Sequence, residues 1–227
     1  IQNLRSLGLL SFNPHRKINI ILGKNNVGKT TVLESIYIGS RLKTFKQTPI
    51  PNLIKHNETF LKILLNVSRI GEKHLICIEK SLKSHNIAKN NLRVIGAKEI
   101  ARLFPVLALA FGNENIINQP SEFRRSILDW GLFHVEHNYL SILHAYQRCL
   151  KQRNYLLKKG SAEEISYWTM RLAESGNKIS ALRKEYFKHL NNKFKAFVEK
   201  ARQSINKPHA DIFNISLAYA PGWDDGE

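Results

Sequence analysis

The sequence has few cysteines and no long apolar run. Its two cysteines, Cys77 and Cys149, lie in apolar-periodic stretches without a Cys or His at metal-ligand spacing, which argues against a disulfide framework or a zinc site. No apolar run approaches the length of a membrane-spanning helix, and the N-terminal segment lacks the layout of a signal peptide. We therefore expect a globular chain in a reducing compartment, without a membrane partner.

Acidic residues are also scarce, which leaves the chain strongly basic. It has 35 Lys and Arg against 18 Asp and Glu, a net charge of +17. The excess is uneven: residues 41–98 carry 12 basic and 3 acidic side chains and residues 135–207 carry 15 and 6, whereas residues 99–134 carry 3 and 4. Such a charge favours a polyanionic partner. The alternative, a lysine-rich composition without a binding role, stays open.

Hydrophobic periodicity predicts a mixed first part of the chain. Residues 17–23 form a short β-branched run that ends in Gly23, and residues 30–42 follow with helical spacing. This pattern predicts a strand, a loop and a helix. Apolar runs between residues 54 and 95 predict antiparallel strands. The run at residues 104–111 predicts one more strand.

The pattern then becomes helical. Ser121 is placed to cap a helix that Gly131 would end. A second helix closes at Gly160, and Ser161 and Glu164 have the spacing of a capping box that opens a third. An apolar stripe of roughly 30 residues runs along this third helix. The second and third helices are predicted to form an antiparallel hairpin, either in an ordinary bundle or as an extended coiled coil.

The most specific motif is Gly23–Thr30, GKNNVGKT. It has the spacing of a phosphate-binding P-loop, in which glycines permit turns that direct backbone N–H groups at a β-phosphate. Lys29 is expected to reach the β- and γ-phosphates, Thr30 to bind Mg²⁺ and Thr31 to contact the α-phosphate side. The predicted nucleotide-binding residues are Gly23, Lys24, Asn25, Asn26, Val27, Gly28, Lys29, Thr30 and Thr31.

Several segments together resemble the RecF family of SMC-like ABC-type ATPases. They are the opening IQNLRSL, the P-loop with Leu33–Tyr37, the segment Asn118–Gly131, Lys151–Asn154 and Gly222–Asp224. The resemblance runs in one register from Ile1 to the end of the chain. It implies an α/β fold, a P-loop ABC-type ATPase head with a helical hairpin lobe. The expected parts are an ATPase lobe over residues 1–104, a helical lobe over 105–207 and the start of a return strand over 208–227.

The resemblance also implies a function. It suggests a cytoplasmic bacterial protein of recombinational DNA repair and replication restart, which binds double-stranded and single-stranded DNA at gaps. Its expected partners are RecR and RecO, with which it would promote RecA loading. ATP and Mg²⁺ would be its cofactors, and the complete protein would form an ATP-dependent homodimer with weak DNA-stimulated ATPase activity. Arg5 aligns with an arginine that such heads often place near the nucleotide.

The sequence departs from the family pattern at three points. Asn26 stands where many members have Gly, and Asn enters left-handed backbone conformations more readily than most residues. Leu107 stands where some relatives have a glutamine that senses magnesium and the attacking water. No apolar run ending in Asp-Glu follows the helical part, and no Ser-x-Gly-Gln-like signature occurs. We therefore expect an N-terminal portion that binds ATP without turnover, its catalytic residues lying beyond the chain.

A hypothesis from another class is a P-loop small-molecule kinase or GTPase whose basic charge is incidental. The guanine-reading Asn-Lys-x-Asp motif is missing, because no Asn-Lys pair is followed by Asp two residues later. This disfavours a GTPase. Arg124 and Arg125 could contact DNA or the nucleotide, or could pair locally with Glu122 and Asp129. The sequence leaves their role open.

Overall fold

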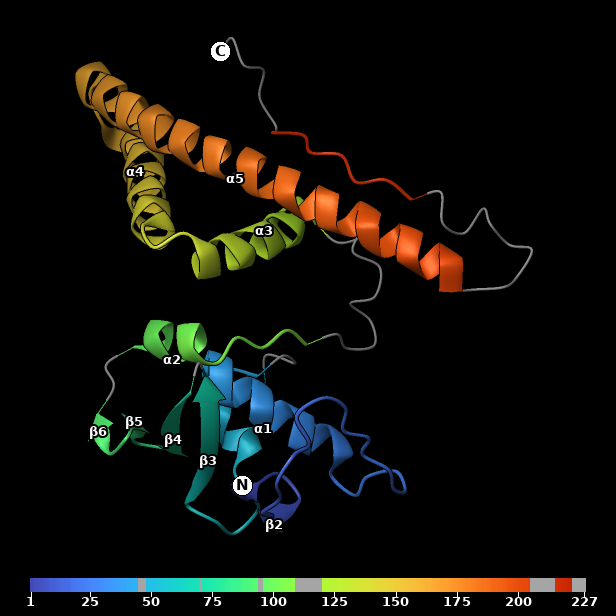
Figure 1. Cartoon of the computed structure of the whole chain (residues 1–227). Coiled ribbons are helices and arrows are strands. Elements are labelled where there is room, and N and C mark those ends of the chain that lie inside the picture. The colour runs from blue at the N-terminus through green and yellow to red at the C-terminus, as the bar shows by residue number, and fades with distance from the viewer. Residues whose placement is uncertain (45–47, 70, 94–95, 109–119, 205–214, 222–227) are drawn as a thin grey trace. The chain divides into compact units, whose positions relative to one another are not determined.

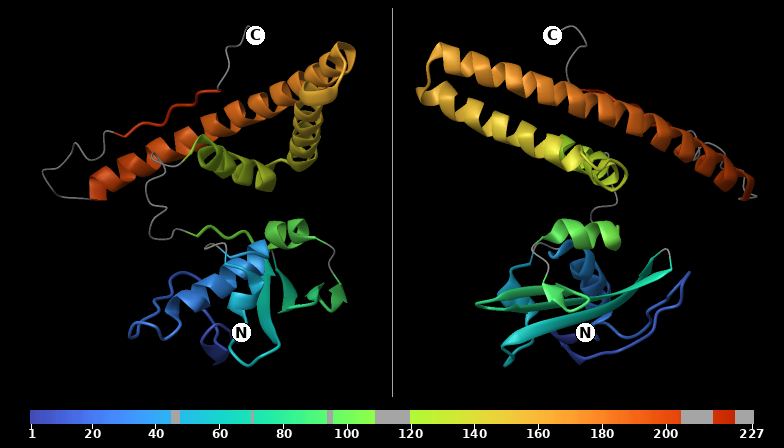
Figure 2. Two further views of the ribbon diagram at one scale, coloured as in Figure 1. Left: turned by 180° about the vertical axis from the view of Figure 1, so that it is seen from behind. Right: turned by 60° about the vertical axis from the view of Figure 1, so that its left-hand side comes forward.

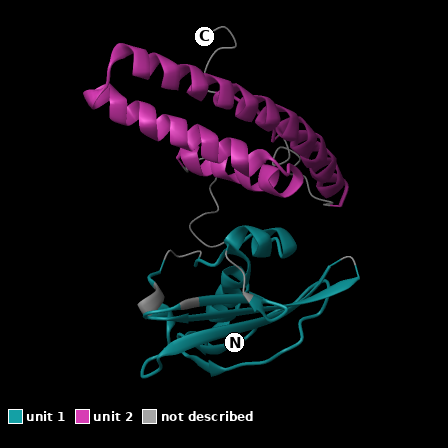
Figure 3. Ribbon diagram, turned by 90° about the vertical axis from the view of Figure 1, so that its left-hand side faces the viewer, with its two compact units in different colours: residues 1–114 teal, residues 115–227 magenta. Residues whose placement is uncertain are grey.

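The computed structural model describes residues 1–44, 48–69, 71–93, 96–108, 120–204 and 215–221. The chain divides into two compact units, residues 1–114 and 115–227 (Figure 3). The first unit combines a sheet with helices, and the second is helical (Figure 1). None of the helices in the described ranges combines the length and the apolarity needed to cross a lipid bilayer.

The described part of the first unit contains a six-stranded sheet in the order β2-β1-β3-β4-β5-β6, in which every neighbouring pair is antiparallel. The strands are β1 (Gln2–Leu4), β2 (Leu7–Leu9), β3 (Phe60–Arg69), β4 (Glu72–Ser81), β5 (His85–Lys89) and β6 (Leu92–Arg93). The hairpin of β3 and β4 pairs in register from Phe60 opposite Ser81 to Arg69 opposite Glu72. The predicted antiparallel strands between residues 54 and 95 are confirmed.

Alternation along β3 and β4 directs one face of the sheet into the core. The inward side chains are fully buried; they are Leu61, Ile63, Ile76 and Ile78. The helices α1 (Lys29–Arg41) and α2 (Ala97–Leu103) pack onto this face through Ile38 and Ile100, and the short 3-10 helix η1 (Ile50–Leu53) adds Leu53. Figure 2 shows both α-helices on the same side of the sheet. This packing fixes the direction in which the N-terminus of α1 points.

The predicted strand at residues 17–23 is wrong. These residues form neither strand nor helix, and Ile18, Ile20 and Leu22 are 75%, 77% and 84% exposed. None of the described strands pairs with this segment. An extended segment without a neighbour cannot satisfy its backbone groups in a ladder, whatever its β propensity. The predicted strand at 104–111 is likewise absent over residues 104–108, and residues 109–111 lie outside the described ranges.

The second unit consists of α3 (Ser121–Val135), α4 (Tyr139–Lys159) and α5 (Ala162–Ser204) in its described residues. The predicted antiparallel hairpin is confirmed, since α4 and α5 run side by side and are joined by a tight turn (Figure 2). Gly160 ends α4, and the predicted capping box opens α5. In it Ser161 N–H donates to Glu164 Oε2 at 3.3 Å, and Glu164 N–H donates to Ser161 Oγ at 3.4 Å.

Two predictions about α3 are wrong. Ser121 is the first helical residue and not the cap, because Pro120 occupies the N-cap position without a side-chain hydrogen bond. The helix also continues through Gly131 to Val135. A Cβ atom at Gly131 would lie 2.0 Å from Tyr186 Oη, so the glycine allows α5 to approach α3 closely. Gly131 is therefore a packing residue.

A partly buried polar cluster connects the three helices of this unit. The carboxylate of Asp129 on α3 accepts hydrogen bonds from Arg183 Nε on α5 at 2.8 Å and from Tyr139 Oη on α4 at 2.5 Å. Tyr139 is buried beside Leu132 and Ile179. Burial, and then the hydrogen bond to Asp129, raise the pKa of Tyr139. Asp129 thus pairs with α5.

Candidate phosphate-binding site

The loop before α1 depends on three residues with positive φ. These residues are Gly23 (φ 155°), Asn26 (φ 64°) and Gly28 (φ 97°). The expectation that Asn26 enters the left-handed region is confirmed. Gly28 is the N-cap residue of α1, and a Cβ atom there would lie 2.8 Å from Leu7 Cδ2. The glycine therefore permits both the turn and the close approach of strand β2.

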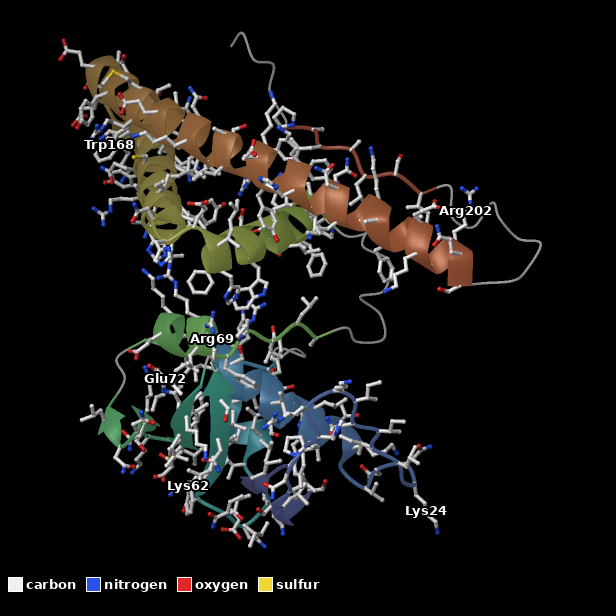
Figure 4. The ribbon with its side chains drawn as sticks, viewed as in Figure 1. Lys24, Lys62, Arg69, Glu72, Trp168 and Arg202 are labelled. Carbon is white, nitrogen blue, oxygen red and sulfur yellow. The ribbon has the colours of Figure 1, made fainter. Side chains whose placement is uncertain are left out.

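Lys29 holds the loop in a ring. Its Nζ donates to the carbonyl oxygen of Gly23 at 2.8 Å and to that of Lys24 at 2.6 Å. The two ends of the loop are thus joined by the ammonium group of the residue that begins α1. Lys24 itself is exposed, and its side chain points away from the protein (Figure 4).

A cavity of about 470 Å³ lies at the N-terminus of α1, a volume within the range of small-molecule sites. It is lined by Arg5, Ser6, Asn25, Asn26, Gly28, Lys29, Thr30, Thr31 and Glu34. Seven of the predicted site residues are therefore brought together. Gly23, Lys24 and Val27 belong to the same loop but do not line this cavity.

The first turn of α1 suits an anion. No side chain caps the helix, and its first turn holds no acidic residue. The N–H groups at a helix start have no intrahelical acceptor, and the helix dipole adds positive potential there. The Lys29 ammonium contributes a full charge at the same place. The arrangement can therefore hold phosphate groups by backbone donors and a cation.

The donor set also fits a magnesium ion that is held mainly by phosphate. Thr30 is exposed and lines the cavity, so its hydroxyl can supply one oxygen, while Thr31 is buried. No cluster of three His, Cys, Asp or Glu side chains that could hold a metal exists within the described ranges. Mg²⁺ commonly keeps several waters and binds nucleotide phosphates with few protein ligands. Thr30 alone is compatible with that mode.

Arg5 is fixed by Glu34, a residue to which sequence reasoning gave no role. Arg5 Nε donates to Glu34 Oε2 at 2.6 Å, and Nη2 donates to Glu34 Oε1 and to Thr48 Oγ1, both at 3.1 Å. Glu34 is only 1% exposed. One signal could have indicated it: Glu34 follows Thr31 by three residues and so shares its helical face.

Comparison with known proteins finds relatives that match nearly the whole chain. The chain matches no family model. Its curated relatives include the DNA replication and repair protein RecF of Nitrosococcus oceani, 28% identical over 227 residues, which covers 98% of this chain and 61% of the relative. RecF of Aliivibrio fischeri is 29% identical over 233 residues, with 99% and 61% covered.

A solved structure of the recombination mediator protein RecF with ATP, in the RecFOR pathway, has a TM-score of 0.74 and 25% identity over 88% of this chain and 55% of that chain. The chain is thus similar to RecF proteins along nearly its whole length. A RecF structure with ATPγS gives a TM-score of 0.73 at 24% identity. The predicted ATPase-head fold and the resemblance to RecF are confirmed. The chain spans about three fifths of the length of the curated relatives it matches.

Proposed function

We propose that this chain is the ATP-binding part of a RecF-type DNA repair protein. The observation that carries the proposal is the P-loop geometry: Lys29 and the start of α1, which no side chain caps, border a cavity large enough for a nucleotide. The likeness to a solved RecF–ATP structure supports ATP as the ligand. In this proposal Lys29 contacts the β- and γ-phosphates, Thr30 holds Mg²⁺ and Arg5 contacts the nucleotide from the other side of the cavity.

The chemistry of the complete protein belongs to the same proposal. Hydrolysis needs a carboxylate that positions water around Mg²⁺, and signature residues that close the γ-phosphate site. The sequence contains no such pair of motifs. We therefore propose that the 227-residue chain binds ATP without turnover, and that an ATP-dependent homodimer with weak DNA-stimulated ATPase activity requires a longer protein.

The substitution Lys29→Ala tests the nucleotide site. It removes a charge-assisted contact to phosphate, so ATP affinity should fall by about ten-fold or more. Lys29 belongs neither to the apolar core of the first unit nor to the apolar core around Tyr139 in the second, so the fold should persist. Titration with a fluorescent ATP analogue measures the affinity, and circular dichroism checks the fold. Lys24→Ala is the matched control, because Lys24 is an exposed loop lysine that points away from the protein (Figure 4). Equal affinity in wild type and Lys29→Ala would contradict the proposal.

For DNA, the second half of α5 is the candidate surface. Between Lys178 and Ser204 it has eight basic and two acidic residues. Lys188, Lys195 and Arg202 follow one another at seven-residue intervals, so they share one face with about 10 Å between them. All three are exposed, and none has an ion-pair partner within the part of the chain that the structure describes. Arg202 points away from the helix near its C-terminal end (Figure 4).

Reversal of these three charges to Glu tests the surface. Binding to duplex, gapped and single-stranded DNA should weaken for every sequence, because contacts to phosphate do not read bases. If each side chain neutralises one phosphate, the slope of log affinity against log salt should become shallower by about 2.7. Filter binding over a salt series measures both effects.

The matched control is the reversal of Lys73, Lys83 and Lys98, three exposed lysines of the first unit, which changes the net charge equally. Binding should fall less in the control. Equal losses would mean that net charge, and not the face of α5, drives the interaction. Affinity that does not depend on salt would refute a phosphate-directed surface altogether.

Action with RecR and RecO in the loading of RecA completes the proposed function. It rests on the likeness to a RecF structure of the RecFOR pathway and to relatives named for DNA replication and repair. A pull-down of purified RecR by the 227-residue chain, with and without DNA, tests the first of these contacts. Absence of binding by this chain, together with binding by a longer RecF protein, would place the contact outside the present sequence.

A further inference from the structure

We propose that Glu34 is a positioning residue, which holds the guanidinium group of Arg5 at the cavity so that it can contact a bound nucleotide. The inference rests on the proposed ATP binding and adds a residue that acts through another one. It starts from the ion pair between Arg5, in the turn that joins β1 and β2, and Glu34 of α1, and from the exposure of these two residues.

The pair is bidentate. Nε and Nη2 of Arg5 donate to the two carboxylate oxygens of Glu34, and Nη2 also reaches Thr48 Oγ1. This fork-to-carboxylate geometry fixes the orientation of the guanidinium plane, which a single contact does not do. The remaining nitrogen, Nη1, has no hydrogen-bond partner among the residues that the structure describes. It can therefore donate to a ligand.

The backbone of Arg5 is fixed as well. Its N–H donates to the carbonyl oxygen of Leu53 at 2.7 Å, and its φ of 51° lies in the left-handed region. Both ends of the side chain are thus held, one by the backbone and one by Glu34. Arg5 reaches the cavity with a restricted set of rotamers, so little conformational entropy remains to be lost when a ligand binds.

The distribution of exposure points to a role beyond packing. Glu34 is 1% exposed, whereas the Arg5 side chain is 30% exposed and lines the cavity together with Lys29 and Thr30. A buried carboxylate needs a compensating partner, and an apolar pair of similar volume often serves stability as well or better. Here the acid is hidden and the cation is presented to the cavity. That arrangement suits an anionic ligand.

The substitution Glu34→Gln distinguishes a positioning role from a purely electrostatic one, because the two roles predict opposite changes in the affinity for an ATP analogue. The amide keeps the size of the side chain but loses the charge and one acceptor, so Arg5 is no longer held by a fork. If Glu34 positions Arg5, the affinity for an ATP analogue should fall by about ten-fold. If Glu34 acts only as a negative charge near phosphate, its neutralisation should raise the affinity.

The experiment is a double-mutant cycle in the full 227-residue chain, with the Mg²⁺ complex of a fluorescent ATP analogue as the probe. Arg5→Ala and Glu34→Gln should each weaken binding by about ten-fold, and the double variant should bind no more weakly than Arg5→Ala. Wild-type or tighter binding by Glu34→Gln would overturn the proposal. So would an equal loss from Glu34→Gln with and without Arg5.

A second variant keeps the carboxylate in place. Arg5→Lys retains the cation opposite Glu34 but lacks the fork, so it should bind the analogue almost as weakly as Arg5→Ala. Wild-type affinity in Arg5→Lys would overturn the proposal, because charge alone would then suffice. Lys29→Ala separates this outcome from a failure of the proposed function. An analogue that binds wild type and is lost in Lys29→Ala, but is unaffected by Glu34→Gln, would refute only the role of Glu34; no binding to wild type would refute both.

Discussion

Replacement of Gly28 by Ala should damage both the fold of the first unit and its nucleotide site. Gly28 has φ 97° and ψ 12° at the N-cap of α1. An L-residue in the left-handed region costs roughly 1–2 kcal/mol. The new Cβ would lie 2.8 Å from Leu7 Cδ2, and a rotamer shift of Leu7 to relieve that contact costs a further ~1 kcal/mol. The free energy of unfolding should therefore fall by about 2–3 kcal/mol.

Gly71→Ala is the matched control for this change. Gly71 has φ 82° in the turn between β3 and β4, and a Cβ atom there would meet no atom within 4 Å. It carries the backbone strain without the clash, so the expected loss is about 1–2 kcal/mol. Gly71 does not line the cavity, and its substitution should leave nucleotide affinity unchanged.

Urea unfolding followed by circular dichroism measures the two losses, and titration with a fluorescent ATP analogue at low urea measures affinity. Gly28→Ala should weaken binding by about ten-fold or more, because the N–H groups at the start of α1 are redirected. Wild-type affinity in Gly28→Ala, with a stability loss no larger than that of Gly71→Ala, would refute the claim that this turn shapes the phosphate site.

Three further predictions concern the second unit and the chain as a whole. The pKa of Tyr139 is raised above its ordinary value of 10.0, so its contribution to stability is complete below about pH 10 and is lost as the pH rises toward the folded-state value. Melting temperatures between about pH 8 and about pH 11 should fall more steeply in wild type than in Tyr139→Phe, and parallel curves would contradict this. Gly131→Ala should cost about 1–3 kcal/mol in urea unfolding, and less in a Tyr186→Ala background, because the clash is with that side chain. Light scattering and a phosphate-release assay should find a monomer without turnover with or without ATP, and an ATP-dependent dimer would refute the assignment of the missing groups.

Local signals predicted the parts of the structure that depend on neighbours in sequence. The capping box of Ser161 and Glu164 and the left-handed turn at Asn26 each involve residues within a few positions, so the sequence alone determines them. The long hairpin followed from its sustained apolar stripe and from the turn at Gly160.

The errors concern contacts between distant parts of the chain. Residues 17–23 have the composition of a strand, but composition does not reveal whether a neighbouring strand is present. From the sequence alone, Gly131 is typical of a helix end. Only the structure shows that it packs against Tyr186, 55 residues later in the chain. Glu34 was missed because hydrophobic periodicity does not reveal that a charged residue lies on the buried face of α1. The structure buries Thr31, Glu34 and Ser35 there, while Leu33 is 54% exposed.

The hydrogen bonds of Lys29 to its own loop have a calorimetric consequence. The ammonium group has three N–H donors, and the carbonyl oxygens of Gly23 and Lys24 accept two of them, so a phosphate can accept the third without opening the loop. Binding then adds a charge-assisted hydrogen bond and breaks none within the loop. The loop already has its ring shape before the ligand arrives, and the entropy of ordering it has been lost during folding. The unfavourable entropy of association at this site should therefore be small, which isothermal titration calorimetry measures.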